Sequence, residues 1–451
     1  MQKREQRRGR PLHFQDKNRL SAARLLVKVE DDQAWAQIVS EGGPDPVPPK
    51  VREYLSGVTR WRRWLDFLID RAYTGDLTEV EPLLRQIARI GAYDLLVLRT
   101  PPHVAVSAAV AVATDAVGAG AGQLANAILR RVADQRDNPP LPSTDDRADD
   151  LGVRWSHPTW LVRRWLHRFG EDGAVALMKV NNDRPWFGVR SNPFSAGARP
   201  IQDVVEGLAL NWKPTPLSDF VSIERLGPLL KAGYVENGSV SVQDVAAAMA
   251  VRLMDPQPNE TIIDACAAPG GKSTYAAALM ENRGRIVAID RNNVRLRMVR
   301  QGSGRQGVRI DDTIEGDFAA MVDDILPRPD RILVDAPCTG LGVLARRPDL
   351  RWRKNDVDIE ALTRLQDRLL DRAAALLGEG GVLVYSTCTI VPEENEGRAV
   401  AFVERHRDFT RESAKGILSD DVLNDAGAME TLPHVHGVDG AYAVRFRRTS
   451  G

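Results

Sequence analysis

An alternation of short apolar strands with helices, beginning near residue 241, leaves this chain few possible folds. Strand-like runs at 261–265, 285–289 and 331–334 are separated by stretches of helical character. Strands that alternate with helices predict a parallel, doubly wound sheet covered by helices on both faces. Ligands bind to such sheets outside the carboxyl ends of the strands. We therefore predict that residues 241–451 form an α/β, Rossmann-like domain with its site at that edge.

Several chemically capable side chains follow the ends of the predicted strands. A glycine-containing loop, 266–272, follows the first strand, and Asp290 ends the second. Asp317, Asp335 and Cys388 follow later strands. The loop consists of Cys266, Ala267, Ala268, Pro269, Gly270, Gly271 and Lys272. We expect these residues to gather at one edge of the sheet.

The loop fits neither of the two common phosphate-binding patterns. A Walker A loop needs a glycine where this chain has Cys266, and the G-x-G-x-x-G pattern is absent. Two adjacent glycines after the first strand still let a ligand approach the backbone closely. Asp290 is placed to accept hydrogen bonds from ribose hydroxyls. The pattern favours a nucleoside cofactor without a pyrophosphate, a description that S-adenosylmethionine meets, over a tight turn beside a surface carboxylate.

The cysteines give a second chemical signal. The chain has three, Cys266, Cys338 and Cys388, and their wide spacing predicts neither a metal site nor a disulfide framework. A single free cysteine is more often a small buried hydrophobe. Cys338 and Cys388 both follow predicted strands, and two thiols at one edge favour thiol chemistry. No histidine lies in either motif, so a Cys-His hydrolase is poorly supported. These residues alone leave open which cysteine is the nucleophile.

The chain before residue 241 divides into three segments. Residues 1–135 show helical apolar spacing without a catalytic constellation, which is typical of an interaction or RNA-binding module. Residues 136–150 combine several prolines with an acidic run and are expected to form a linker. Residues 151–240 mix helix and strand signals and are expected to form a small α+β subdomain.

Basic residues cluster locally although the chain is neutral. Its 61 Lys and Arg balance 61 Asp and Glu, yet residues 1–24 hold eight Lys or Arg. Arginine and tryptophan alternate at 60–64 and again within 346–354. Several such patches favour a polyanion-binding face, whereas a single one is more often a solvated surface. No stretch reaches the roughly 18 apolar residues of a membrane span, and the few cysteines favour a reducing, cytoplasmic setting.

Three motifs carry a resemblance to a known family. Asp264–Ser273, Asp335–Gly342 and Ser386–Ile390 resemble motifs of RNA cytosine-5 methyltransferases, which use S-adenosylmethionine. Val242–Asp244 and Gly316–Asp317 match further motifs of that family.

The N-terminal segment adds a second resemblance. Its helical character and Leu124–Arg131 are similar to a NusB-like domain. A NusB-like domain before this catalytic domain resembles the Sun, or Fmu, branch, which methylates 16S ribosomal RNA. The implied architecture is an all-α NusB-like domain, a small α+β subdomain and a doubly wound methyltransferase domain. The implied partner is 16S ribosomal RNA, free or in a partly assembled small subunit, and no metal is implied.

The resemblance implies a cofactor role for part of the site. The loop Cys266–Lys272 would wrap the methionine and ribose of S-adenosylmethionine. Asp290 would hold the ribose hydroxyls, and Asp317 would lie near the adenine. Asp335 would line the cavity between the cofactor and the target base.

The resemblance also assigns the two strand-end cysteines. Cys388 would be the nucleophile that adds to carbon 6 of cytosine, which makes carbon 5 reactive toward the methyl group. Cys338 would help to release the product, and Asp335 would stabilise the adduct near nitrogen 3.

Two other functions remain open from the sequence. A tRNA cytosine-5 methyltransferase would share the chemistry and differ only in its substrate. A non-catalytic NusB-like RNA-binding or assembly factor would have no use for the two cysteines and the acidic strand ends. An amino-group methyltransferase is less well supported, because such enzymes tend to carry Asn/Asp-Pro-Pro-Tyr/Phe where this chain has Asp335-Ala-Pro-Cys338.

Overall fold

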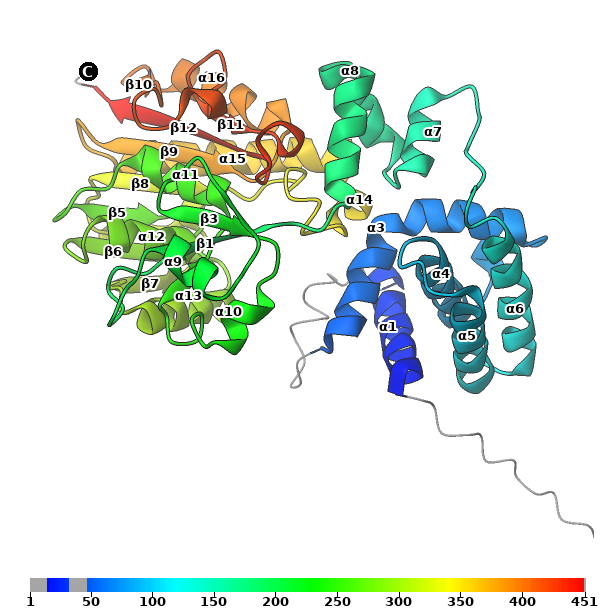
Figure 1. Ribbon diagram of the computed structural model, residues 1–451. Helices are drawn as coiled ribbons and strands as arrows, with labels where there is room; N and C mark the ends of the chain where they lie inside the picture. The colour runs from blue at the N-terminus through cyan, green and yellow to red at the C-terminus, as the bar shows by residue number, and fades with distance from the viewer. Residues whose placement is uncertain (1–13, 32–46, 450–451) are drawn as a thin grey trace, which may run out of the picture. The chain divides into compact units, whose positions relative to one another are not determined.

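The computed structural model describes residues 14–31 and 47–449, so the first part of the basic N-terminal run lies outside the described residues. They form two compact units (Figure 1). The first unit runs to Asp183 and also includes Arg347–Arg353, and the second comprises the remainder. A short peptide from the C-terminal half of the sequence therefore belongs to the N-terminal unit. The domain boundaries expected at residues 135, 150 and 240 stay predictions.

The first unit is helical, as the sequence predicts. Prolines occupy the first positions of three of its helices, where the missing backbone N–H costs nothing. Glu81 caps one of them by accepting a hydrogen bond from the backbone N–H of Leu84 at 2.8 Å. The elements are α1 (Phe14–Asp31), α3 (Pro49–Ala72), η1 (Leu77–Glu79), α4 (Pro82–Leu96), α5 (Pro102–Ala116), α6 (Ala119–Asp134), α7 (Arg147–Arg154), α8 (Thr159–Asn182) and α14 (Leu350–Arg353). Their apolar faces share a core that includes Tyr54, Ile87, Leu95, Val112 and Leu129.

The second unit begins with a small subdomain of strands and helices from Arg184 onward, and the predicted subdomain bounds of 151–240 stay a prediction. It has a four-stranded antiparallel sheet in the order β2-β3-β1-β4. Its elements are β1 (Phe187–Ser191), α9 (Ile201–Gly207), β2 (Trp212–Pro214), β3 (Phe220–Ile223), α10 (Gly227–Lys231) and β4 (Val240–Val242).

The larger sheet confirms the predicted doubly wound α/β fold. Its order is β10-β12-β9-β8-β5-β6-β7, with β11 paired to β12. Strands β5 to β9 are parallel, and β12 runs antiparallel to β9. The strands are β5 (Thr261–Asp264), β6 (Arg285–Asp290), β7 (Asp312–Glu315), β8 (Arg331–Asp335), β9 (Val382–Thr387), β10 (Phe409–Glu412), β11 (Met429–Thr431) and β12 (Ala441–Arg448). The order of the strands reverses between β5 and β8, which is where such sheets bind ligands.

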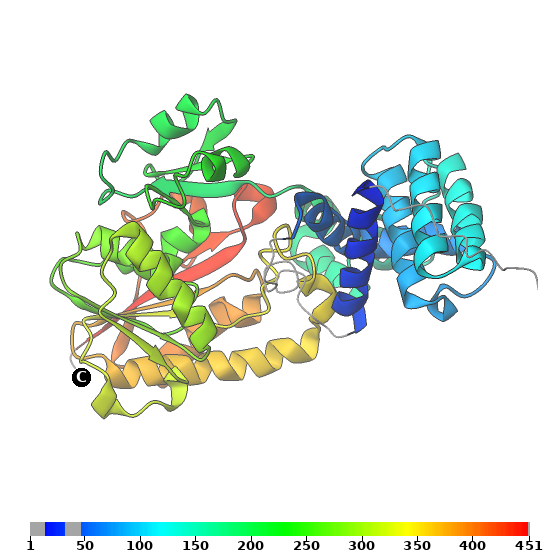
Figure 2. The same cartoon turned by 90° about the horizontal axis from the view of Figure 1, so that it is seen from below.

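Helices cover both faces of this sheet, so its strands are apolar on both sides. Ile262 of β5 packs with α11 and α12, and the next residue, Ile263, packs with α15 and α16. Figure 2 shows α15 running along one side of the sheet. The helices are α11 (Val245–Met254), α12 (Gly271–Leu279), α13 (Asn293–Gln306), α15 (Asp356–Leu376), α16 (Glu396–Arg405) and α17 (Pro433–His436). Short 3₁₀ turns are η2 (Phe318–Ala320), η3 (Asp323–Ile325), η4 (Pro392–Glu394) and η5 (Asp420–Val422).

Within the described part of the chain, no helix combines the length and apolar character that crossing a membrane requires.

Candidate active site

The loop between β5 and α12 has a backbone path that depends on glycine. Gly270 has a φ of 104°, which L side chains rarely adopt, and a Cβ there would lie 3.0 Å from the Cα of Val299. A Cβ at Gly271 would come no closer than 3.7 Å to any neighbouring heavy atom. The loop therefore turns tightly at Gly270, and at Gly271, where α12 begins, a Cβ would make ordinary van der Waals contact with the Gln243 side chain.

Asp290 ends β6 directly beside this loop. Its buried carboxylate accepts hydrogen bonds from the backbone N–H of Ala268 at 3.1 Å and of Asn292 at 3.0 Å. Arg295 lies 3.5 Å away. Two carboxylate oxygens have about four acceptor positions. The carboxylate thus fixes the loop and retains capacity for further donors.

Asp317 lies at the end of the neighbouring strand, β7. Its carboxylate caps the short turn η2 by accepting from the backbone N–H of Ala319 at 3.2 Å. The guanidinium of Arg291 is 3.9 Å from it. Asp317 and Asp290 therefore lie at adjacent strand ends, as the sequence predicts for one edge of the sheet.

The thiol of Cys266 is surrounded by carboxylates. Burial, followed by the charges of Asp335, Asp264, Asp290 and Asp317, raises the pKa of this thiol well above its usual range. Cys266 consequently keeps its proton and is a poor nucleophile.

Lys272 and Asp335 form an ion pair at the carboxyl end of β8. The Lys272 ammonium lies 2.7 Å from one oxygen of Asp335, and the Ser386 hydroxyl donates to the other oxygen at 2.8 Å. Burial disfavours the ammonium charge, but Asp335 outweighs burial and raises the pKa of Lys272. A charged lysine therefore lies at this strand end.

Cys338 and Cys388, 50 residues apart, meet at the same edge. Their sulfur atoms are 3.3 Å apart. The hydrogen bond to Cys388, together with burial, raises the pKa of the Cys338 thiol. Cys388 is exposed, whereas Cys338 is partly buried. The arrangement presents Cys388 to a substrate and places a protonated thiol behind it.

A buried carboxylate that sequence reasoning did not single out connects the two cysteine loops. Glu394 is fully buried and accepts hydrogen bonds from the backbone N–H of Thr339 at 2.9 Å and the Gln366 amide at 3.0 Å. The Thr339 hydroxyl also donates to Glu394, and it lies 2.8 Å from the hydroxyl of Thr389. Thr339 and Thr389 each follow one of the cysteines.

A small cavity collects several of these side chains. Its volume is about 70 Å³, and Lys272, Asp335 and Cys388 all line it. Asp244 and Asp439 line it too, and both contact Arg346, at 3.2 and 2.6 Å. The sequence had placed Asp244 in a motif without a role, and no local pattern marks Arg346 as its partner.

Asp439 has an unusual environment in this cavity. Burial and the nearby charge of Asp244 raise its pKa to about 8, although Arg346 opposes the shift. Arg346 also donates to the backbone carbonyl of Trp186 at 2.7 Å. The guanidinium therefore joins the start of the small subdomain to the cavity wall.

Within residues 14–31 and 47–449, no cluster of His, Cys, Asp and Glu has the arrangement of a metal site. The predicted residues instead form two neighbouring groups. Lys272, Asp335 and Cys388 line the cavity with Cys338 in contact, and the loop lies beside Asp290. The chemistry available is thiol addition next to a charged lysine–carboxylate pair.

Comparisons with known proteins agree with this geometry. The family described as 16S rRNA methyltransferase RsmB/F matches residues 251–447, and the NusB family matches residues 16–134. The probable ribosomal RNA small subunit methyltransferase B of Bacillus subtilis (strain 168) is 30% identical over 441 residues, covering 95% of this chain and 98% of that protein. The protein of the same name from Synechocystis sp. (strain ATCC 27184 / PCC 6803 / Kazusa) is 35% identical over 416 residues, covering 89% and 92%. The crystal structure of PH0851 shares the fold, with a TM-score of 0.80 at 24% identity, and covers 97% of this chain and 100% of that one.

Proposed function

The chain belongs to the 16S rRNA methyltransferase RsmB/F family and is of the Sun, or Fmu, type, and from that premise we propose that it methylates carbon 5 of a cytosine in 16S ribosomal RNA. The observation that carries this proposal is the 3.3 Å contact between the sulfurs of Cys338 and Cys388. Methyl transfer to an amino group needs no thiol, whereas transfer to carbon 5 of cytosine needs a nucleophile that first adds to the ring.

The residues present fit S-adenosylmethionine as the methyl donor. Asp290 has acceptor capacity for ribose hydroxyls, and two adjacent glycines, Gly270 and Gly271, carry no side chain that would keep a ligand from the backbone. Asp317 lies one strand further along the edge, near where an adenine would follow. S-adenosylmethionine, when bound, supplies a methyl group on a positively charged sulfur.

Cys388 is the proposed nucleophile. Its thiolate adds to carbon 6 of the cytosine, a new C–S bond forms, and the electron pair moves toward carbon 5, which then takes the methyl group. The two sulfurs are 3.3 Å apart, and once Cys388 is a thiolate only Cys338 can donate, so its S–H would stabilise the thiolate before attack and when it leaves. In product release the carbon 5 proton passes to a water molecule, the C–H electron pair re-forms the double bond between carbons 5 and 6, and the C–S bond breaks to return Cys388 as a thiolate. Cys338 has a physical role there because its S–H stabilises the departing thiolate.

The pair of Lys272 and Asp335 is the proposed stabiliser of the adduct. Negative charge develops on nitrogen 3 of the ring as the thiolate adds. Asp335, held by Lys272 and Ser386, would pass to that nitrogen a proton from the Lys272 ammonium, and the proton would return to Lys272 when the adduct breaks down. A fixed charged pair in a small cavity needs little reorganisation at the moment of reaction.

The remaining proposals concern the domain bounds, the RNA substrate and the location of the protein. We assign residues 1–135 as a NusB-like RNA-binding domain, 136–150 as a linker, 151–240 as a subdomain and 241–451 as the catalytic domain. The target cytosine has to be unstacked to reach Cys388, and RNA affinity should fall as salt rises. A 16S ribosomal RNA substrate and three free cysteines support a cytoplasmic location.

Isotope-labelled S-adenosylmethionine tests the proposal. The full chain is incubated with unmodified small-subunit ribosomal RNA or with tRNA, and the digested nucleosides are identified by mass spectrometry. We expect labelled 5-methylcytidine at one site of the ribosomal RNA and none with Cys388→Ala. If only tRNA is labelled, the substrate is tRNA and not 16S ribosomal RNA, and the proposed reaction still stands. A labelled base other than cytosine would refute the reaction.

A further inference from the structure

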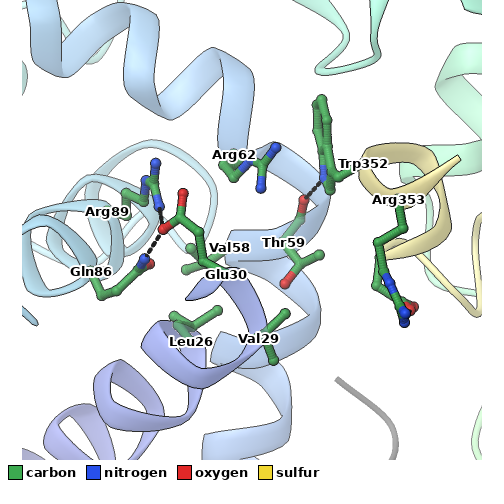
Figure 3. Close-up of a pocket in the computed structure, with 11 residues that line it drawn as sticks. Leu26, Val29, Glu30, Val58, Thr59, Arg62, Gln86, Arg89, Trp352 and Arg353 are labelled. Carbon is green, nitrogen blue, oxygen red and sulfur yellow. Dashed lines mark hydrogen bonds and ion pairs between the residues drawn. The ribbon is translucent and has the colours of Figure 1, made fainter. Parts of the chain in front are cut away.

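A second cavity, outside the proposed active site, lies within the N-terminal unit. It has a volume of about 160 Å³ and is bounded by α1, α3, α4 and the peptide 347–353 (Figure 3). Leu26 and Val58 contribute apolar surface. A cavity of roughly 150 Å³ admits a benzene ring, so this one has room for one six-membered ring, either a single-ring base or the amino-bearing six-membered ring of guanine.

One wall of the cavity is a tryptophan with a stacked arginine. The Trp352 indole N–H donates to the backbone carbonyl of Thr59 at 2.7 Å, which fixes the ring. The Arg62 guanidinium carbon lies 4.4 Å from the ring centroid. Among residues 14–31 and 47–449, no hydrogen-bond acceptor pairs with the Arg62 guanidinium, so its planar face and N–H groups are available.

The opposite side of the cavity presents a carboxylate. One oxygen of Glu30, Oε2, is 2.7 Å from the Arg89 guanidinium and also accepts from the Gln86 amide. The other oxygen, Oε1, receives no hydrogen bond from the described residues. Burial opposes ionisation of Glu30, but Arg89 outweighs it and lowers the pKa. Glu30 is therefore an ionised acceptor with one oxygen unused.

These walls select the class of ligand. The lining also holds Arg62, Arg89 and Arg353, but Arg89 is already paired with Glu30. A phosphate on Arg62 would share the cavity with the negative charges of Glu30 and Asp349. An aliphatic group would leave Glu30 Oε1 and Arg62 without hydrogen-bond partners, which is costly once water is displaced. A flat heteroaromatic ring with an N–H donor satisfies both groups. Unstacked RNA bases are recognised in this way, on aromatic side chains and arginine planes.

We propose that this cavity binds one unstacked RNA base that carries an exocyclic amino group, stacked at Arg62 and Trp352 and donating to Glu30. The proposal rests on the proposed function, since it makes the N-terminal unit a reader of one base in the RNA substrate. It also explains why Trp352, from far along the sequence, is built into that unit.

Binding of short RNAs to the full chain, without cofactor, tests the proposal. The probes are dye-labelled single-stranded pentamers of uridine with guanosine or an abasic ribose at the centre, followed by fluorescence anisotropy at constant salt. Neither probe contains cytosine, so the target-base site is not addressed. We expect the guanosine probe to bind about tenfold tighter than the abasic one, since stacking of one base is worth roughly that much.

Matched variants on one helix isolate the cavity. Arg62→Gln removes a charge from the cavity, and Arg71→Gln removes a charge from an exposed position of α3, where Arg71 faces Phe67. We expect Arg62→Gln to erase the preference for guanosine and Arg71→Gln to keep it with a small uniform loss of affinity. Val29→Phe fills the cavity without changing any charge and should also erase the preference.

The proposal is overturned if the wild-type chain binds both probes equally. It is also overturned if the preference survives in Arg62→Gln and Val29→Phe variants whose thermal unfolding is unchanged. Labelling of cytosine in ribosomal RNA is measured separately, so a failure of the methyl-transfer proposal would remain distinguishable from a failure of this one.

Discussion

Glu394 should control both stability and turnover, because it connects the two cysteine loops. Glu394→Ala leaves the buried backbone N–H of Thr339 without an acceptor and removes one of two acceptors from the Gln366 amide. An unsatisfied buried donor costs about 1–3 kcal/mol, and truncating a fully buried side chain leaves a cavity that adds to this. We expect the free energy of unfolding to fall by about 3 kcal/mol. A displacement of about 1 Å between the loops would slow methyl transfer about 100-fold.

Glu394→Gln separates hydrogen bonding from charge. The amide oxygen can accept from the Thr339 N–H and Gln366, and Thr339 can turn its hydroxyl toward Thr389. Burial raises the pKa of Glu394, so folding favours its protonated form. The unfolding free energy of the wild-type chain should therefore fall as pH rises above the ordinary pKa of a glutamate, and that of Glu394→Gln should fall less.

Urea unfolding and single-turnover methyl transfer, measured on the same preparations, check this reasoning. Glu404→Ala, an exposed position on α16, is the matched control and should change neither quantity. If Glu394→Ala keeps wild-type turnover, the hydrogen bonds of Glu394 do not position the two cysteines. A Gln variant as damaged as the Ala variant would show that charge, and not hydrogen bonding, is what matters.

Three further predictions follow from the other contacts. Cys388→Ala should abolish methyl transfer while retaining S-adenosylmethionine binding by calorimetry; retained turnover would contradict its role. Asp439 has a pKa raised to about 8, so its contribution to stability is present at low pH and is lost as pH rises toward about 8. Asp439→Asn should flatten the dependence of the unfolding free energy on pH between the ordinary pKa of an aspartate and about 8. An unchanged slope would refute the raised pKa of Asp439. Arg351→Ala removes four hydrogen bonds, to the carbonyls of Arg60, Ser156 and Asn181 and the amide oxygen of Asn182. It should lower the stability of the N-terminal unit by about 3 kcal/mol, and an unchanged unfolding curve would show that Arg351 contributes little.

The sequence predicted the large sheet because its signals are local. The strands β6 and β8, which pair with β5 on either side, are short apolar runs in the sequence. Each of them ends at an aspartate, Asp290 or Asp335. Parallel strands then bring their carboxyl ends together without further information. The helical N-terminal unit was predictable for a similar reason, since its apolar spacing repeats within each helix.

Contacts between distant residues were not predictable in this way. Arg346 meets Asp439, 93 residues away, and no spacing rule relates them. The basic cluster 346–354 had been interpreted as a polyanion-binding patch, yet Arg351 is fully buried and bonds to backbone carbonyls of the N-terminal unit. Tertiary packing, which decides burial, leaves little local trace in a run of arginines.

A covalent adduct is the most direct test of the central claim. Cys338→Ala should slow release of the product and leave the RNA attached to the protein. The variant is incubated with S-adenosylmethionine and small-subunit ribosomal RNA, digested with nuclease and protease, and analysed by mass spectrometry. The account predicts a peptide in which Cys388 carries 5-methylcytidine, absent when Cys388→Ala is added. Normal turnover without any adduct, or an adduct on another residue, would contradict it.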